Sequence, residues 1–192
     1  MLVLASKSQR RKEILDQTGL EYKIIESPYI EEDNKILKDD PQKYVELLSF
    51  NKALAVFNNH QDDLIIGADT IVVLEKQILE KPHDKADAFR MLRALSDKTH
   101  KVLTSVTLIN KNKTITFTCV SSVTFKSLTD DQINEYIVSE EPMDKAGAYA
   151  IQGIGRALIL EYQGDILNII GLPLNELLNV LSKEFHLNID KK

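Results

Sequence analysis

The chain of 192 residues lacks several common features, and each shortage excludes a class of protein. It contains one cysteine, Cys119, which rules out an internal disulfide and a cysteine-rich zinc site. Its four histidines have no metal-ligand spacing, and no G-x-G-x-x-G, G-x-S-x-G or glycine-rich P-loop pattern occurs. No apolar run is long enough to span a membrane. We therefore expect neither a membrane protein nor a standard dinucleotide-binding, α/β-hydrolase or ATPase site.

The composition that remains is that of a globular protein, with 43% hydrophobic and 28% charged residues. The length suits a single domain over residues 1–192. A net charge of −5 argues against binding of long nucleic acid through bulk electrostatics. The opening "MLVLASKSQRR" has an apolar stretch shorter than that of a signal peptide, with its basic residues after it. We therefore expect a cytoplasmic protein.

Hydrophobic periodicity and turn residues predict an α/β protein with a mixed sheet, because hairpins interrupt the alternation of helices and strands. The expected strands cover residues 2–5, 21–27, 64–74, 76–80, 100–110 and 114–126, with two more around residues 150–169. The expected helices cover residues 41–59, 84–95, 129–139 and 171–185, and another is capped by Ser6 or Ser8 and ends at Gly19.

The most informative stretch is "LIIGADTIVVL", residues 64–74, in which a single carboxylate interrupts an apolar strand. We expect Gly67 to bend the chain just before this residue, Asp69. A buried ionised carboxylate costs several kcal/mol unless another group compensates its charge. Asp69 is therefore either a structural carboxylate bonded to backbone or to a lysine, or part of a functional site.

Several cations and acids suggest what such a site would bind. Lys52 shares the core-facing stripe of the helix over residues 41–59. Lys81 precedes a proline and is expected either to contact phosphate or to pair with Asp69. The segment "SKSQRRKE" joins a strand to a helix N-terminus, where backbone N–H groups favour an anion. An acidic run lies at residues 31–33. Each has an ordinary structural explanation as a surface or partly buried charge. Together they indicate phosphate-ester chemistry, with carboxylates for metal and water and cations for phosphate.

Four blocks of sequence resemble the Maf family of nucleoside triphosphate pyrophosphatases. "LASKSQRRKEIL" is similar to its N-terminal L-A-S-x-S-P-R-R signature. "GADTIVVLEKQILEKP", followed by "AFRMLRALSDKTHKVLTSV", resembles the central block. "EPMDKAGAYAIQG" and "GDILNIIGLPL" resemble the C-terminal blocks, so that the match spans almost the whole chain in order.

The resemblance implies an elongated, two-lobed mixed-sheet fold with a central cleft, similar to that of inosine triphosphate pyrophosphatases. It also implies that Mg²⁺ or Mn²⁺ and water cleave a nucleoside triphosphate to the monophosphate and pyrophosphate. Asp69 matches the general base and, with Glu31, holds the metal. The expected strand ends at the cleft, which would explain the position of Asp69. Positions that match substrate-binding residues of the family are Ser6, Arg10, Arg11, Lys52, Lys81 and Lys145.

Arg10, Thr70 and Gln152 match the branch of the family that acts on dTTP and UTP. A glutamine amide both donates and accepts hydrogen bonds, which suits a uracil or thymine edge. We therefore expect pyrimidine nucleotides, plain or modified, as substrates in nucleotide-pool housecleaning. The alternatives are another nucleotide such as 7-methyl-GTP, or a non-catalytic nucleotide- or protein-binding regulator of septum formation. A homodimer would be unsurprising, although no apolar stripe marks an interface.

The chain departs from the family pattern at three positions. Gln9 replaces the usual proline, Asp97 a glycine in "LSG" and Ser105 a glycine in "TG". If either glycine position requires a positive φ, its replacement strains the backbone there.

Overall fold

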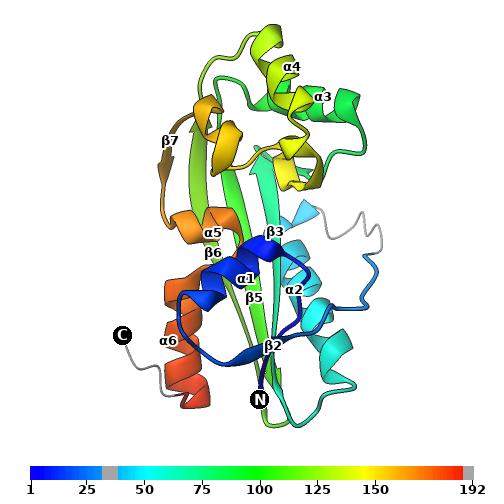
Figure 1. The fold of residues 1–192 in the computed structure, drawn as a ribbon, viewed down its shortest axis with the longest axis vertical. Helices are drawn as coiled ribbons and strands as arrows, with labels where there is room; N and C mark the ends of the chain where they lie inside the picture. The colour runs from blue at the N-terminus through cyan, green and yellow to red at the C-terminus, as the bar shows by residue number, and fades with distance from the viewer. Residues whose placement is uncertain (32–38, 188–192) are drawn as a thin grey trace.

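The computed structural model describes residues 1–31 and 39–187, and these form an elongated α/β structure (Figure 1). In this described part the sheet has seven strands in the order β2-β1-β3-β5-β6-β7, with β4 paired to β3. The strands are β1 (Leu2–Leu4), β2 (Tyr22–Ile24), β3 (Leu64–Leu74), β4 (Gln77–Leu79), β5 (Thr99–Asn110), β6 (Lys113–Phe125) and β7 (Ile159–Gln163). β1 runs parallel to β2 and β3, whereas the other pairs are antiparallel. The predicted mixed sheet is confirmed.

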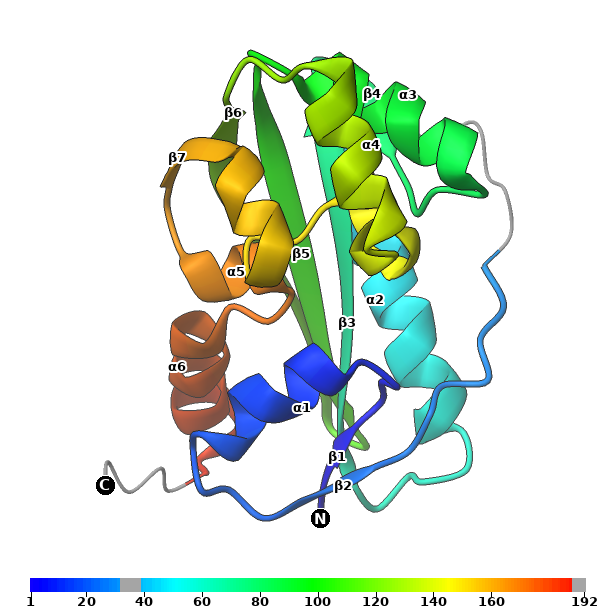
Figure 2. The same ribbon diagram turned by 45° about the horizontal axis from the view of Figure 1, so that its top comes forward.

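Helices lie on both faces of the sheet (Figures 1 and 2). They are α1 (Gln9–Asp16), α2 (Pro41–Phe57), α3 (Lys85–Leu95), α4 (Asp130–Val138), α5 (Ile166–Ile170) and α6 (Leu174–Phe185). Three 3₁₀ turns, η2 (Glu141–Asp144), η3 (Ala146–Ala148) and η4 (Gly153–Leu158), lie between α4 and β7. None of the helices in the described ranges has the length and apolar character needed to cross a bilayer.

Side-chain caps mark the starts of several helices, and Ser8 is one of the two caps expected for α1. Ser8 accepts a hydrogen bond from the backbone of Arg11 at the start of α1, and Asp40 caps α2 just before Pro41. Thr129 forms a complete capping box with Gln132 at the start of α4.

The prediction of two strands around residues 150–169 is wrong in part, because only β7 forms there. Gly153 and Gly164 have φ of 72° and 100°, which turns the chain out of an extended path on both sides of β7. Asp165 then caps α5 through the backbone N–H of Leu167, so the apolar run after it is helical.

The long strand β3 carries two separate cores on one face and a third set of contacts on the other. Ala68 packs with α1 and α6 in one core, which defines the lower lobe, and Val72 packs with α3 and α4 in a second core, which defines the upper lobe. Between them, Thr70 bonds to Thr104 of β5 at 3.0 Å, so polar residues mark the boundary of the two lobes. On the opposite face, Ile65 and Ile71 pack against α2.

Gly67 allows α2 to lie directly on β3. A Cβ atom at this position would be 2.5 Å from the carbonyl oxygen of Ser49 and 2.6 Å from the backbone nitrogen of Ala53. No bend occurs at Gly67, contrary to our expectation, since β3 is continuous from Leu64 to Leu74. The glycine is required for close packing of a helix on a strand, not for a turn.

We predict that Gly67→Ala lowers the free energy of unfolding by about 2 kcal/mol, because the added methyl group meets backbone atoms that cannot move independently. Denaturant unfolding of the two proteins measures this change. An unchanged unfolding midpoint would contradict the close approach of α2 to β3.

Candidate active site

A cleft of roughly 1260 Å³ lies between the two lobes and is lined from both. This exceeds the about 300–1,000 Å³ typical of small-molecule pockets, so the cleft can hold a large polar ligand. It brings together every site residue that the sequence predicts, namely Ser6, Arg10, Arg11, Glu31, Lys52, Asp69, Thr70, Lys81, Lys145 and Gln152. Glu32 and Asp33 of the acidic run lie outside the described residues.

The cleft lies where β3 loses its neighbours on one side. β1 pairs with β3 as far as Ile66, and β4 begins to pair only at Val72. Residues 67–71 are therefore paired on the β5 side alone. We expected β3 to end at the cleft; instead β3 continues through it and the strands beside it end. This gap places Asp69 at the cleft while keeping it on a rigid central strand.

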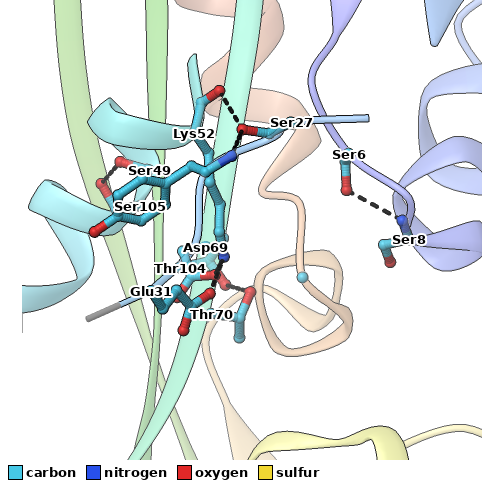
Figure 3. A network of polar contacts seen from close by, with 12 residues as sticks. Ser6, Ser8, Ser27, Glu31, Ser49, Lys52, Asp69, Thr70, Thr104 and Ser105 are labelled. Atoms are coloured by element: carbon cyan, nitrogen blue, oxygen red, sulfur yellow. Dashed lines mark hydrogen bonds and ion pairs between the residues drawn. The ribbon is translucent and has the colours of Figure 1, made fainter. Parts of the chain in front are cut away.

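Asp69 is 9% exposed and points towards α2, where its charge is compensated. The ammonium group of Lys52 contacts Asp69 Oδ1 and lies 2.6 Å from Glu31 Oε1 (Figure 3). Burial alone would lower the pKa of Lys52, but the charges and hydrogen bonds of Asp69 and Glu31 outweigh it and the net pKa is raised. The cleft therefore contains a protonated lysine held between two carboxylates.

The second predicted lysine behaves differently. Lys81 lines the cleft but is exposed and forms no ion pair with Asp69 or with any other described residue. Our alternative that Lys81 pairs with Asp69 is therefore wrong, and Lys52 takes that position. The neighbouring Glu80, which the sequence analysis passed over, also lines the cleft and accepts a hydrogen bond from the Tyr44 hydroxyl at 3.0 Å.

Arg11 is bound to the protein by all three guanidinium nitrogens. Nε donates to the carbonyl oxygen of Gly171 at 2.8 Å, and the terminal nitrogens donate to Ser6 Oγ at 3.3 Å and Thr70 Oγ1 at 3.2 Å. Desolvation lowers its pKa from the usual value, with Asp69 acting in the opposite direction. Arg11 thus joins α1, β3 and the turn after α5 beneath the cleft.

Arg10 and Lys145 come from opposite lobes and contact the same carboxylate. Asp144 of η2 lies 3.3 Å from the Arg10 guanidinium and 2.5 Å from the Lys145 ammonium group. Burial raises the pKa of Asp144, but its two cationic partners lower it by a larger amount. The net pKa of Asp144 is therefore below its usual value. No sequence pattern singled out Asp144, although it directly precedes Lys145 in the "DKAG" segment.

Asp69 and Glu31 present oxygen ligands of the kind that Mg²⁺ and Mn²⁺ prefer. Their carboxylates already converge on one cation, the Lys52 ammonium group. No group of three or more potential metal ligands occurs among residues 1–31 and 39–187. Two carboxylates nevertheless fit Mg²⁺, which is commonly held by one or two carboxylates together with water and substrate phosphates.

The departures from the family pattern have different structural consequences. Asp97 has a φ of 59°, so a residue other than glycine does adopt a left-handed conformation there. Ser105 instead lies in the middle of β5, opposite Asp69, and its Oγ is 3.0 Å from Ser49 Oγ on α2. Only the Asp97 replacement therefore carries the expected backbone strain.

Comparison with known proteins identifies the family of this chain. The family model described as "Maf-like protein" matches residues 1–184. The chain belongs to the Maf family. Over 187 residues it is 46% identical to the dTTP/UTP pyrophosphatase of Acholeplasma laidlawii, covering 97% of each chain. It is 44% identical over 188 residues to that of Bacillus anthracis and 42% over 191 residues to that of Clostridioides difficile, covering 98% of this chain and 97% of each relative.

Among solved structures, this Maf chain is similar to a nucleoside-triphosphatase / dITP/XTP pyrophosphatase from Mycobacterium abscessus. The TM-score is 0.48 and the sequence identity 11%, with 96% of each chain covered. This likeness is too distant to support an inference about the present chain.

We predict that Arg11→Lys lowers the free energy of unfolding by about 2 kcal/mol, because lysine cannot reproduce three divergent hydrogen bonds. Arg10→Lys is the matched control, and its exposed ion pair should change stability by less than about 0.5 kcal/mol. Denaturant unfolding checks both values. Equal effects of the two substitutions would contradict the internal role of Arg11.

Proposed function

We propose that this protein is a metal-dependent nucleoside triphosphate pyrophosphatase that cleaves dTTP and UTP to the monophosphate and pyrophosphate. The observation that carries the proposal is the Lys52 ammonium group between Asp69 and Glu31, inside a cleft with cations on both rims. Membership of the Maf family and the names of the three relatives support the same reaction. The catalytic unit is the single domain of residues 1–192.

In this function Asp69 is the general base. Its ionised carboxylate, stabilised by Lys52, accepts a proton from the water that attacks the α-phosphorus in line with the leaving pyrophosphate. Lys52, Lys81 and Lys145 bind the phosphate oxygens and offset the charge that develops on the leaving group. Ser6 and the α1 N-terminus bind phosphate on the lower rim, and Arg11 holds this rim in position.

Asp69 and Glu31 would hold the divalent cation. When bound, this ion would neutralise phosphate charge and lower the pKa of the attacking water.

Recognition of the base is assigned to Gln152, with Arg10 and Thr70. The Gln152 side chain is exposed, lines the cleft and makes no hydrogen bond to a described residue, so its amide can pair with uracil or thymine. The Thr70 hydroxyl already bonds Arg11 and Thr104, so its contribution is to the shape of the cleft floor.

A cytoplasmic location suits this function, because its substrates belong to the cellular nucleotide pool and the cysteine Cys119 is free. The proposed partner is the nucleoside triphosphate alone, with no polymeric nucleic acid and no membrane. A homodimer is compatible with this function.

We predict fast pyrophosphate release from dTTP and UTP with Mg²⁺ or Mn²⁺, and release at least about tenfold slower from CTP, dATP, GTP and 7-methyl-GTP. A chelator should abolish the activity. Comparable rates on purine nucleotides would overturn the pyrimidine assignment but not the mechanism. Nucleotide binding without cleavage would instead favour the non-catalytic regulator.

We predict that Asp69→Asn lowers kcat for UTP by about 10³-fold while the affinity for UTP stays within a few fold, because an amide cannot accept the proton. Asp62→Asn makes the same chemical change at an exposed aspartate outside the cleft and should leave kcat unaltered. Turnover and calorimetric binding measure the two quantities. Full activity of the Asp69 variant would remove this residue from its role.

A further inference from the structure

We propose that Glu141 is a positioning residue for base recognition, which holds the backbone segment that presents Gln152 to the substrate. This inference rests on the proposed function, since it assigns Gln152 to the pyrimidine base. Glu141 begins η2 in the upper lobe and lines the same cleft.

The Glu141 carboxylate binds the chain immediately after Gln152 with both oxygens. Oε1 accepts a hydrogen bond from the backbone N–H of Ile154 at 3.1 Å, and Oε2 accepts one from Gly155 at 2.8 Å. Hydrogen bonds from N–H groups to a charged carboxylate are stronger than those between neutral groups. A residue thirteen positions away in sequence thus fixes the start of η4.

Gly153 is shaped for this contact. Its φ is 72°, and a Cβ atom there would lie 2.2 Å from Glu141 Oε1. Only glycine therefore lets the carboxylate approach the backbone directly beside Gln152. The glycine and the glutamate form one arrangement, and neither is explained by packing of the core alone.

A second contact fixes the same segment before Gln152. The backbone N–H of Ala150 donates to the buried hydroxyl of Tyr136 at 3.1 Å, and a Cβ atom at Gly155 would lie 2.6 Å from that hydroxyl. Gln152 therefore lies between two fixed points, one on α4 and one on η2. The backbone therefore sets the position from which the Gln152 side chain reaches into the cleft, since this side chain makes no hydrogen bond to a described residue.

Glu141 also contacts the phosphate end of the cleft, but through a different atom. Its backbone carbonyl oxygen accepts a hydrogen bond from the Lys145 ammonium group at 2.7 Å. A change of the Glu141 side chain removes the contact to the Gln152 segment and leaves this carbonyl in place. An effect on binding of the base can therefore be distinguished experimentally from an effect on binding of the phosphates.

The test compares Glu141→Gln with wild type and with Gln152→Ala. The glutamine amide retains one acceptor and directs an N–H group at the other backbone donor, so the segment loosens. We expect KM for UTP to rise about tenfold with kcat within about twofold, because the phosphate end is unchanged. In the Gln152→Ala background the same substitution should change KM by less than about twofold, since its effect passes through Gln152.

Glu135→Gln, at an exposed position of α4 outside the cleft, is the matched control and should leave KM and kcat unchanged. If Glu141→Gln fails to fold, Glu141→Asp retains the charge but withdraws it from the N–H groups and should raise KM in the same direction. A fall in kcat at constant KM overturns the proposal. So does an effect in the Gln152→Ala background as large as that in wild type.

Failure of the proposed function is distinguishable from failure of this inference. If the unaltered protein does not cleave UTP, the proposed function alone is overturned. The inference is then tested by comparing the same variants, with the calorimetric affinity for UTP in place of KM. Equal affinities of wild type and Glu141→Gln for UTP overturn the inference.

Discussion

The contact on which the site depends is the Lys52 ammonium group held between the carboxylates of Asp69 and Glu31. Asp69 lies in an otherwise apolar strand, and an unpaired buried carboxylate would cost several kcal/mol. Lys52 offsets this cost only because α2 lies against β3. That close approach requires glycine at position 67, because any side chain there would meet the backbone of α2. The close packing allowed by Gly67 therefore determines whether Lys52 can reach the two carboxylates.

The same sheet that brings these groups together also opens the cleft. β3 and β5 remain paired through the whole site, while β1 and β4 stop short of each other on the outer side of β3. The site thus has a rigid floor and an accessible edge, and preorganised groups need both. The polar pair of Thr70 and Thr104 lies at this level, where the cores of the two lobes separate.

Two adjacent arginines show how position determines role. Arg11 donates hydrogen bonds to three oxygen atoms of the protein and stabilises the lower lobe beneath the cleft. Arg10 is more exposed and shares the Asp144 carboxylate with Lys145 of the other lobe. An exposed ion pair contributes little to stability. In the proposed function, a triphosphate in the cleft would compete with Asp144 for both cations.

The sequence by itself determined most of the local structure and the chemical character of the site. Apolar periodicity located β3, and the helix-start residues Pro41 and Thr129 marked the starts of α2 and α4, because these signals act over a few neighbouring residues. Motif resemblance identified the residues that line the cleft. Only the tertiary structure decided that Lys52 rather than Lys81 pairs with Asp69, and that Glu141 bonds the segment after Gln152. Such contacts join residues far apart in the chain, and their geometry depends on how helices pack on the sheet, which no local pattern encodes.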